Sequence, residues 1–406
     1  MHWKYNTTRA YSSVVLNDSE IVISGIAVRV PESDNMEEFA NNLFGGVDMV
    51  TGKSMVELKG DFMVIVSLWQ RMTAVTRLGF MTCQEDMESS SPRINLMLHF
   101  SVYLTDKPVK WIHNCGCCWN FPSKLLWTQV ILWLNEYLIK LLQKNGIAST
   151  GCNPSNLRGS NTGVFIGAMN NDAEEYWTSL PSPEEVDGYG LLGSTRSMLA
   201  NRISFAFDFQ GPSFALDTAS SSSLVAFTQA VLAIRAGHCD AALVGGVQLT
   251  LKAKNSLHYE RLGMLSPEGK CKSFDRSADG FVKSEAAVVL YIRTAKEARR
   301  VYATIINART NNDGFKEEGI TFPSRTAQRK LLKECYAEAS ISPAEVMYIE
   351  AHGAGTPVGD PEEAAAIYDV FCQDYKIQRT ARPLLIGSVK SNMGHAEAAA
   401  GKYLFP

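Results

Sequence analysis

The chain has 406 residues, of which 46% are hydrophobic and 20% are charged, and its formal net charge is −3. This length can bury a large core in two or three domain-sized units, and the near-neutral charge gives no electrostatic reason to expect nucleic acid or an anionic membrane as a partner. Nine scattered cysteines, an odd number, favour a reducing compartment over a disulfide framework, and no stretch approaches the roughly 18 apolar residues that span a bilayer. We therefore expect a cytoplasmic α/β protein that binds neither nucleic acid nor a membrane.

The first predicted elements are a buried strand at 20–30 (EIVISGIAVRV), rich in β-branched residues, and a helix at 36–44 that ends at a Gly-Gly pair. The segment 61–143 differs from the rest of the chain, because it holds five of the seven tryptophans but only two glycines and shows no alternation of strand, turn and helix. Residues 130–143 (VILWLNEYLIKLLQ) are the one convincing amphipathic helix in that segment.

From residue 147 to residue 401 the sequence alternates between strand and helix patterns. The predicted strands are 163–167, 213–217, 241–249, 286–292, 303–306, 347–350 and 384–389. The predicted helices are 222–236, 327–339 and 361–371. Strands that alternate with helices indicate a layered α/β fold with substantial parallel sheet.

Three motifs in this region carry candidate chemistry. The first is GPSFALDTASSSSLVAF at 211–227, where an apolar strand ends and small residues lead into a helix that begins near Ser220. A side chain at such a corner lies at a helix N-terminus, where unpaired N–H groups favour developing negative charge. The structural alternative is a strand, a turn and a helix with serine N-caps.

The second and third motifs each place a histidine after a strand. In IEAHGAGTPVGDPEE, at 349–363, a strand delivers His352 into a glycine-rich turn where backbone and ligand can come close. In IGSVKSNMGHAEAAAG, at 386–401, a strand leads to Lys390 and His395 at the start of an alanine-rich helix. A structural histidine and a capped helix with a surface lysine are the alternatives, but two strand ends that each present a histidine favour a constructed site.

In order and spacing, the three motifs resemble the β-ketoacyl synthases of the thiolase superfamily. The flanking stretches ANRISFAFDFQGPS (200–213), MLSPEGKCKSFDRSADGF (264–281) and TNNDGFKEEGITFPS (310–324) extend the resemblance. PESDNMEEFANNLFGGVDMVT (31–51) and ARRVYATIINA (298–308) are similar to the animal, in particular the insect, type I fatty acid synthases. The resemblance covers about residues 20–60 and 144–401.

This resemblance implies a thiolase fold, with two related halves in α-β-α-β-α layers. The N-terminal half is expected at 20–250, and the C-terminal half at 251–406. The implied activity is decarboxylative Claisen condensation of malonyl thioester with an acyl chain, both carried on the phosphopantetheine arm of acyl carrier protein. We expect no directly bound cofactor, and a homodimer.

The resemblance also assigns roles to individual residues. Position 220 is a cysteine in the family and takes the acyl chain as a thioester. His352 and His395 match the histidines that bind the malonyl thioester carbonyl, and Lys390 matches the lysine that supports them. Two further positions are implied near the substrate: Thr356, which matches a threonine that helps to hold the pantetheine arm, and Glu363, which matches a buried acidic residue.

The chain departs from the family at residues with chemical consequences. Ser220 replaces the nucleophilic cysteine, and an alcohol ionises far above the pKa of about 8.5 of a thiol, so acylation is expected to fall by orders of magnitude. The family's histidines act on the other substrate, so we expect no serine-activating dyad, whereas decarboxylation needs no nucleophile. Ala354 stands where the family has threonine, which removes a hydroxyl contact to pantetheine of about 1 kcal/mol.

Two segments depart as well. Residues 61–143 do not match the family, and a shifted reading frame at 126–129 (LWTQ) can produce the family's Met-Asp-Pro, so we interpret this segment as frameshifted or intronic. The chain also ends at Pro406 where the family continues, so we expect an incomplete C-terminal half that lacks its final strands and one oxyanion-hole donor.

Other readings of the sequence are less favoured. The cluster His113, Cys115, Cys117 and Cys118 lacks a second separated pair, so no metal site is expected. A serine hydrolase would need a G-x-S-x-G motif, which is absent. Two hypotheses remain: a condensing domain, active or reduced to malonyl decarboxylation, and a non-catalytic paralogue that serves as a dimer partner or is unstable.

Overall fold

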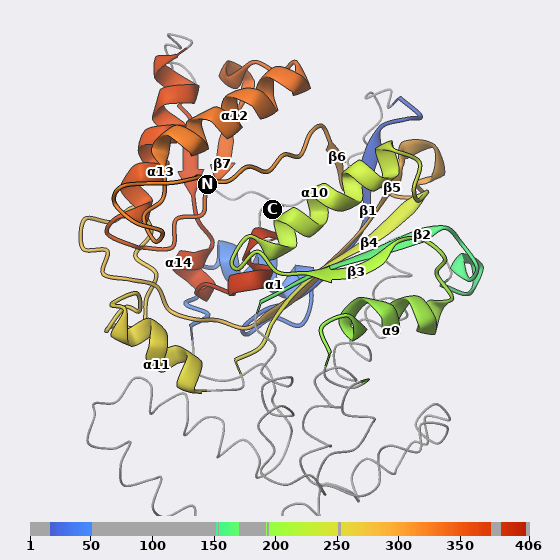
Figure 1. Ribbon diagram of the computed structural model, residues 1–406, viewed down its shortest axis with the longest axis horizontal. Coiled ribbons are helices and arrows are strands. Elements are labelled where there is room, and N and C mark those ends of the chain that lie inside the picture. Colours follow the sequence, from blue (N-terminus) through green and yellow to red (C-terminus); the bar gives the residue numbers. More distant parts are fainter. Residues whose placement is uncertain are drawn as a thin grey trace, which may run out of the picture.

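The computed structural model describes residues 17–50, 152, 154–169, 192, 195–250, 253–374 and 383–402. The predicted amphipathic helix at 130–143, and the rest of the segment 61–143, lie outside the described residues. Within the described part, the strands form one six-stranded and one two-stranded sheet, and helices pack on both faces of the larger sheet (Figure 1). In the same part of the chain, no helix is long and apolar enough to cross a membrane.

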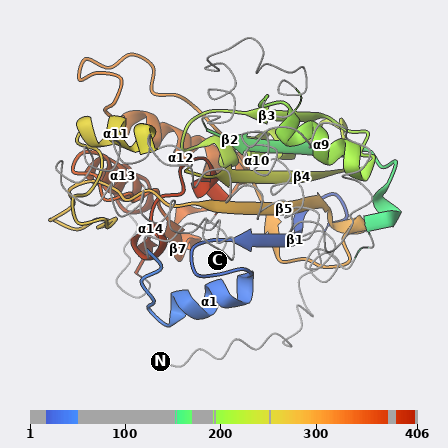
Figure 2. The same ribbon diagram turned by 90° about the horizontal axis from the view of Figure 1, so that it is seen from below.

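The strands of the larger sheet are β1 (Ile21–Arg29), β2 (Thr162–Ala168), β3 (Ser213–Leu216), β4 (Ala241–Gln248), β5 (Ala286–Thr294) and β6 (Ala303–Ile305). Their order across the sheet is β3-β2-β4-β5-β1-β6, and Figure 2 shows the first five side by side. The pairs β3–β2 and β2–β4 are parallel, as expected from the alternation of strands and helices. In contrast, β4–β5, β5–β1 and β1–β6 are antiparallel, so the sheet is mixed.

Seven α-helices lie in the described ranges: α1 (Met36–Phe44), α9 (Met198–Phe207), α10 (Ser222–Arg235), α11 (Ala253–Arg261), α12 (Arg325–Ala339), α13 (Gly359–Tyr368) and α14 (Lys390–Met393). Shorter helical turns are η2 (Pro154–Leu157), η4 (Ala295–Glu297), η5 (Pro343–Glu345), η6 (Asp369–Gln373) and η7 (Glu397–Lys402). The helices predicted at 36–44, 222–236, 327–339 and 361–371 are confirmed as α1, α10, α12 and α13 with η6. The sequence placed the start of α10 near Ser220, but the helix begins two residues later, at Ser222.

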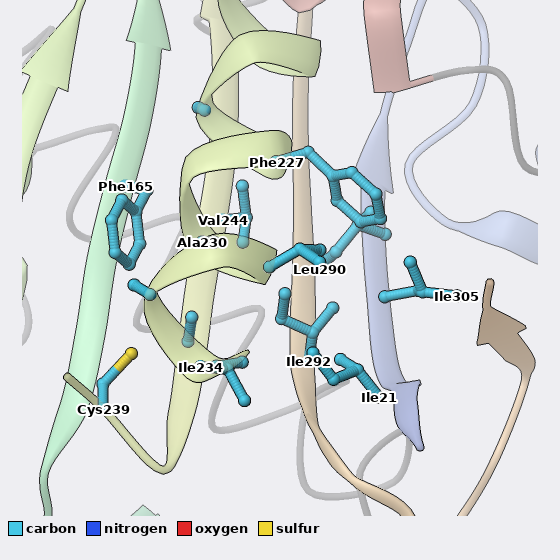
Figure 3. Close-up of a cluster of buried hydrophobic side chains, with 14 of the residues drawn as sticks. Ile21, Phe165, Phe227, Ala230, Ile234, Cys239, Val244, Leu290, Ile292 and Ile305 are labelled. Atoms are coloured by element: carbon cyan, nitrogen blue, oxygen red, sulfur yellow. The ribbon is translucent and has the colours of Figure 1, made fainter. Parts of the chain in front are cut away.

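Alternating side chains of the central strands face two different helices. Phe165, Val244 and Leu290 pack with the apolar side of α10 in the cluster that Figure 3 shows. Their chain neighbours Val164 and Leu243 point to the opposite face and pack with α9. This division follows from the two-residue period of a strand, and it makes α10 a rigid element buried against the sheet.

The second sheet pairs β7 (Tyr348–Glu350) with β8 (Leu385–Gly387) in parallel. Its covering helices are α12 and α13, which lie beside β7 in Figure 1, and the cluster between them includes Phe371 and the partly buried Tyr336. Because the two strands are parallel, their carboxyl ends lie at the same edge of the sheet. The loop with His352 follows β7, and α14 with Lys390 follows β8, so one edge of this sheet presents both motifs.

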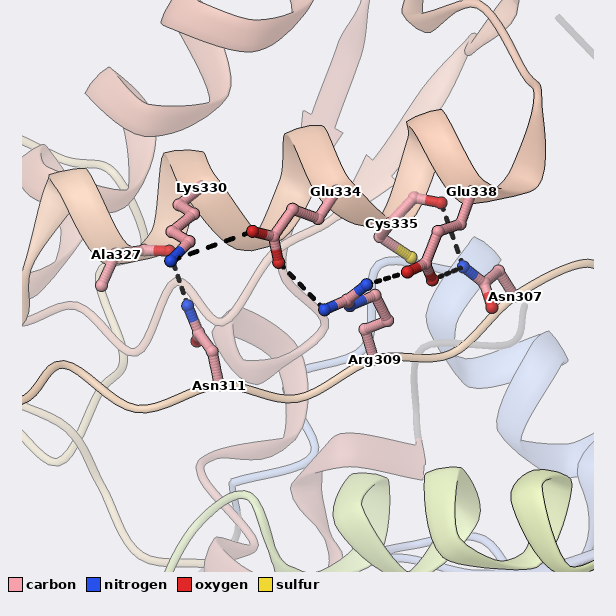
Figure 4. Close-up of polar contacts among 8 residues, drawn as sticks. All are labelled: Asn307, Arg309, Asn311, Ala327, Lys330, Glu334, Cys335 and Glu338. Atoms are coloured by element: carbon pink, nitrogen blue, oxygen red, sulfur yellow. Dashed lines mark hydrogen bonds and ion pairs between the residues drawn. The ribbon is translucent and has the colours of Figure 1, made fainter.

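A row of hydrogen bonds and ion pairs joins α12 to the segment that follows β6 (Figure 4). Arg309 pairs with both Glu334 and Glu338, one helical turn apart on α12. Asn307 donates to Glu338 and to the carbonyl oxygen of Cys335. These contacts are partly exposed, so each contributes little on its own, but together they fix the segment along the helix.

Truncation of Phe165 tests the importance of the cluster under α10. Phe165 is 1% exposed and its ring meets Phe214 edge-to-face at 5.0 Å, so Phe165→Ala is expected to lower the free energy of unfolding by about 3–5 kcal/mol. Phe315, which is 92% exposed, provides the matched control, and Phe315→Ala should change it by less than about 0.5 kcal/mol. Urea unfolding measures both, and equal losses would show that this cluster is not the core.

Candidate active site

Ser220 lies at the corner between β3 and α10. The preceding residue, Ala219, has a φ of +54°, a left-handed conformation that is uncommon for a residue with a side chain. The hydroxyl of Ser222 holds this turn, since it accepts from the Thr218 N–H at 2.9 Å and donates to the Ala219 carbonyl at 2.6 Å. The serine run therefore fixes the backbone of the corner, and Ser220, which is partly exposed, presents its hydroxyl from it.

A glycine in β2 allows this corner to sit close to the sheet. A Cβ atom at Gly167 would lie 2.5 Å from the backbone of Ser222 and Ser223, so any side chain there would push the first turn of α10 away. Close approach of this kind is a role that only glycine fills. The position of Ser220 thus depends on β2 as well as on its own helix.

His395 reaches Ser220 from the other end of the chain. Its ring nitrogen Nε2 lies 3.2 Å from Oγ of Ser220, within hydrogen-bond distance. The residue is 2% exposed, and its ring packs edge-to-face with Phe281 at 5.1 Å between centroids. Its backbone is fixed on both sides, since its N–H donates to Val282 at 2.8 Å and its carbonyl accepts from Ser284 at 3.0 Å.

His352 lies next to His395, with ring centroids 5.2 Å apart and ring planes at 87°. Both oxygens of the Glu363 carboxylate hold its loop, because they accept the N–H groups of His352 and Gly353 at 2.7 and 2.8 Å. The buried ammonium of Lys390 donates to the His352 carbonyl at 2.7 Å. The structure therefore brings together Ser220, both histidines, Lys390 and Glu363, as the motifs predicted.

Burial and nearby charges lower the pKa of both imidazoles, which favours their neutral forms. For His395, burial, followed by His352, Lys390 and Lys283, lowers the pKa well below its usual value. For His352, part of the side chain is open to solvent, yet the crowding around it and then Lys390 lower the pKa in the same direction. A neutral imidazole carries one N–H and one lone pair, so each histidine can donate one hydrogen bond to a substrate oxygen at neutral pH.

Lys390 and Glu363, which hold the loop of His352, also have shifted pKa values. Burial lowers the pKa of Lys390, although Glu350 and Glu363 counteract it. Burial likewise raises the pKa of Glu363, against its two backbone hydrogen bonds. The Lys390 ammonium and the Glu363 carboxylate each hydrogen-bond to backbone atoms of the loop that carries His352, at 2.7–2.8 Å. Their opposite charges stabilise each other, and the hydrogen bonds hold that loop in place.

His395 lies within reach of Ser220, but it is a poor base. The sequence led us to expect no serine-activating dyad; the structure nevertheless places a ring nitrogen of His395 3.2 Å from Oγ of Ser220, within hydrogen-bond reach. Within the described residues, however, Nδ1 of His395 has no hydrogen-bond partner, whereas serine hydrolases hold this nitrogen with a carboxylate. Together with the lowered pKa, this makes proton abstraction from Ser220 weak.

Thr356 and Ala354 have structural contacts in the glycine-rich turn. The hydroxyl of Thr356 accepts the Gly359 N–H at 3.1 Å at the start of α13. Ala354 is 2% exposed and packs with Cys271 and Phe281, so its methyl group offers little surface to a ligand in this conformation. Their predicted contacts to a pantetheine arm remain predictions.

Sequence reasoning missed Asp360, which organises the same turn. Its carboxylate accepts the N–H groups of Gly355, Thr356 and Phe274, and it is 3% exposed. The sequence contained a clue to this role, since an acidic residue before Pro361 at a helix start is typical of an N-terminal cap.

Metal ligation has no support in the part of the chain that the structure describes, where no group of three or more His, Cys, Asp or Glu residues could hold an ion. The cluster at 113–118 that we considered as a zinc site lies outside the described residues.

The fold and the site together define a thiolase-like α/β condensing enzyme. This chain belongs to the β-ketoacyl synthase family: the profile of the β-ketoacyl synthase N-terminal domain matches residues 138–298, and that of the C-terminal domain matches residues 302–404. The boundary that we expected near residue 250 remains a prediction.

Individual relatives agree with this assignment. A fatty acid synthase of the goose Anser anser anser is 40% identical over 385 residues, which cover 94% of this chain and 95% of that sequence. A probable polyketide synthase of Dictyostelium discoideum is 40% identical over 275 residues, which cover 61% of this chain but only 9% of the relative.

Solved ketosynthases share the fold. The oxazolomycin ketosynthase domain of Streptomyces albus JA3453 superposes with a TM-score of 0.67 at 30% identity, covering 95% of this chain and 61% of that one. A ketosynthase from module 6 of the bacillaene synthase of Bacillus subtilis 168 gives a TM-score of 0.66 at 29% identity, covering 94% and 59%. This chain therefore spans about three fifths of the length of these ketosynthases.

Removal of the Glu363 carboxylate tests how the His352 loop is held. Glu363→Ala leaves the N–H groups of His352 and Gly353 without their acceptor, and it should lower the free energy of unfolding by about 2 kcal/mol. Its neighbour Glu362, in the first turn of α13, is the control, and Glu362→Ala should cost about 0.5 kcal/mol. Chemical denaturation of both variants decides, and equal effects would contradict the anchoring role.

Proposed function

We propose that this chain is the β-ketoacyl synthase region of an animal-type fatty acid synthase and that its histidine pair decarboxylates a malonyl thioester. The substrate would arrive on the phosphopantetheine arm of acyl carrier protein, and the working form would be a cytoplasmic homodimer. The observation that carries the proposal is the pair of adjacent imidazoles beside Ser220: Nε2 of His395 lies 3.2 Å from Oγ, and the ring of His352 lies 5.2 Å from that of His395. The similarity to a goose fatty acid synthase over 94% of this chain supports the choice over a polyketide synthase.

Decarboxylation needs no nucleophilic side chain. The bond between the α-carbon and the carboxylate of the malonyl group breaks, and carbon dioxide leaves. The electron pair of that bond passes into the enolate of the remaining thioester. N–H donors from His352 and His395 would stabilise the negative charge that develops on the thioester oxygen. The enolate then takes a proton from water, which gives an acetyl thioester, or attacks an acyl carbonyl.

Condensation requires an acyl group on residue 220, and serine makes this step slow. An alcohol needs a general base to become a nucleophile, and His395 is a weak one because its pKa is lowered and its Nδ1 lacks a partner among the described residues. We propose that Ser220 replaces the family's cysteine and that this chain is impaired in condensation. The second candidate function is that of a non-catalytic dimer partner, and the slow acylation of Ser220 favours it as well.

Malonyl decarboxylation is the first test. The purified chain with a malonyl-pantetheine thioester should release carbon dioxide, and Ser220→Ala should keep the rate within about threefold because no nucleophile is required. His395→Ala should reduce it about 10²-fold, as expected for loss of one donor to the developing oxyanion. Coupled detection of carbon dioxide measures the rates. If the wild-type chain releases none, the non-catalytic candidate takes its place.

Acylation of Ser220 is the second test. Incubation with a saturated acyl-pantetheine thioester together with the malonyl-pantetheine thioester should leave Ser220 without an ester while the malonyl thioester releases carbon dioxide over many turnovers, and no β-ketoacyl product should form. Intact-protein mass spectrometry detects an ester, with Ser220→Ala as the control for other acylation sites. Rapid formation of an ester on Ser220 would show that His395 is an effective base after all.

A further inference from the structure

The residues around His395 include an ion pair to which the motifs assigned no role. Lys283 follows Val282 and precedes Ser284, the two residues that fix the backbone of His395. Its Nζ atom lies 3.1 Å from Oε1 of Glu397, two residues beyond His395, and the two side chains are 10% and 2% exposed. The pair therefore joins the segments on both sides of His395.

Glu397 has an unusual backbone for a buried acidic residue. Its φ is +36°, a left-handed value that is strained for a residue with a side chain. Gln248 at the end of β4 donates to its Oε2 at 2.8 Å. A buried charge in a strained backbone persists only where its surroundings over-determine it, and strain of this kind concentrates at functional sites.

An aromatic chain connects the pair to the ring of His395. Lys283 Nζ lies 4.4 Å above the ring of Tyr259, and that ring meets Phe281 edge-to-face at 5.9 Å. Phe281 in turn meets the imidazole of His395 at 5.1 Å. Burial, then the charge of Glu397 and a hydrogen bond to it, raise the pKa of Tyr259 to about 12, so Tyr259 stays neutral beside the pair.

We propose that Lys283 and Glu397 are a positioning pair that fixes His395 toward Ser220. This inference rests on the proposed function, because it assigns the pair a role in that site. The contacts of the pair described above lead to the segments and the ring of His395, so the pair acts through His395. Loss of Lys283 would remove a positive charge from the neighbourhood of the imidazole and take away the cation that lies against the Glu397 carboxylate.

The charges that face His395 come from several elements. Lys283 and Glu397 flank it, Lys390 and His352 lie on its other side, Tyr259 stands beyond Phe281, and the thiol of Cys271 contacts its backbone. Lys283, Lys390 and the neighbouring histidine all lower its pKa. Removal of the Lys283 ammonium must therefore raise the pKa of His395, and the carboxylate that remains must raise it further.

The decisive experiment compares Lys283→Met with the double variant Lys283→Met/Glu397→Gln in the full chain. The titration of His395 is followed by NMR of protein labelled at histidine Cε1, with His395→Ala to assign the resonance. The midpoint should rise in Lys283→Met and lie between that value and the wild-type value in the double variant, because the carboxylate is gone. Lys283→Arg keeps the charge and should preserve the wild-type titration.

The rate of malonyl decarboxylation is the second readout. In Lys283→Met the acid limb of the pH profile should move to higher pH, and the plateau kcat should fall about tenfold with little change in KM, because a displaced histidine loses transition-state contacts. Arg325→Met is the matched control, since it removes the cation from another buried carboxylate, Asp369, between α12 and η6. It should lower stability without moving the profile.

The titration separates the two proposals. If the chain has no decarboxylase activity, the proposed function fails, but the NMR midpoint of His395 still reports on the pair. An unchanged midpoint in folded Lys283→Met overturns the positioning role, and so does an equal shift in Arg325→Met. If the double variant does not fold, the comparison of Lys283→Met with Lys283→Arg decides. If Lys283 had only a structural role, neither substitution would change the titration midpoint of His395.

Discussion

The hydrogen bond from Nζ of Lys390 to the carbonyl oxygen of His352, at 2.7 Å, joins the two loops on which the site depends. Lys390 is 3% exposed, so its ammonium is removed from water and requires both an acceptor and nearby negative charge to remain inside. The His352 carbonyl is the acceptor, and Glu350 and Glu363 supply the negative charge. The hydroxyl of Ser388, which follows β8, donates to the same carbonyl at 3.1 Å, so the loops after β7 and β8 meet at one oxygen atom.

The same ammonium sets the chemistry of the histidines. Burial lowers the pKa of both imidazoles, and the charge of Lys390 lowers it further, which favours the neutral rings that can donate a hydrogen bond without being acids. An imidazole whose pKa is lowered in this way is, for the same reason, a weak base. One electrostatic arrangement thus suits the site to stabilise an enolate and makes it unsuitable for the activation of Ser220.

Most of the local structure could be predicted from the sequence, because the relevant signals lie within a few residues. The strand before Ser220, the helix after it and the strand-end positions of His352 and His395 follow from apolar runs that end at glycine and small residues. The helix α11 was missed, since among its described side chains, at 255–261, only Ser256 is buried, and its apolar residues form no stripe. The antiparallel pairing of β1 with β5 was also missed, because its register depends on contacts across the whole chain.

The supporting contacts of the site were harder to foresee for the same reason. Gln248 and Glu397 meet across 149 positions, and no local pattern connects them. Lys283 is separated from its carboxylate by all the elements from β5 to α14, and in the sequence it looks like one more solvated lysine. The motifs identify which side chains take part in the chemistry, whereas their orientation and protonation depend on residues that only the fold brings near. In this chain, the geometry of Ser220 and His395 alone would indicate a dyad, and the burial of His395, together with the cations around it, explains why it is a weak one.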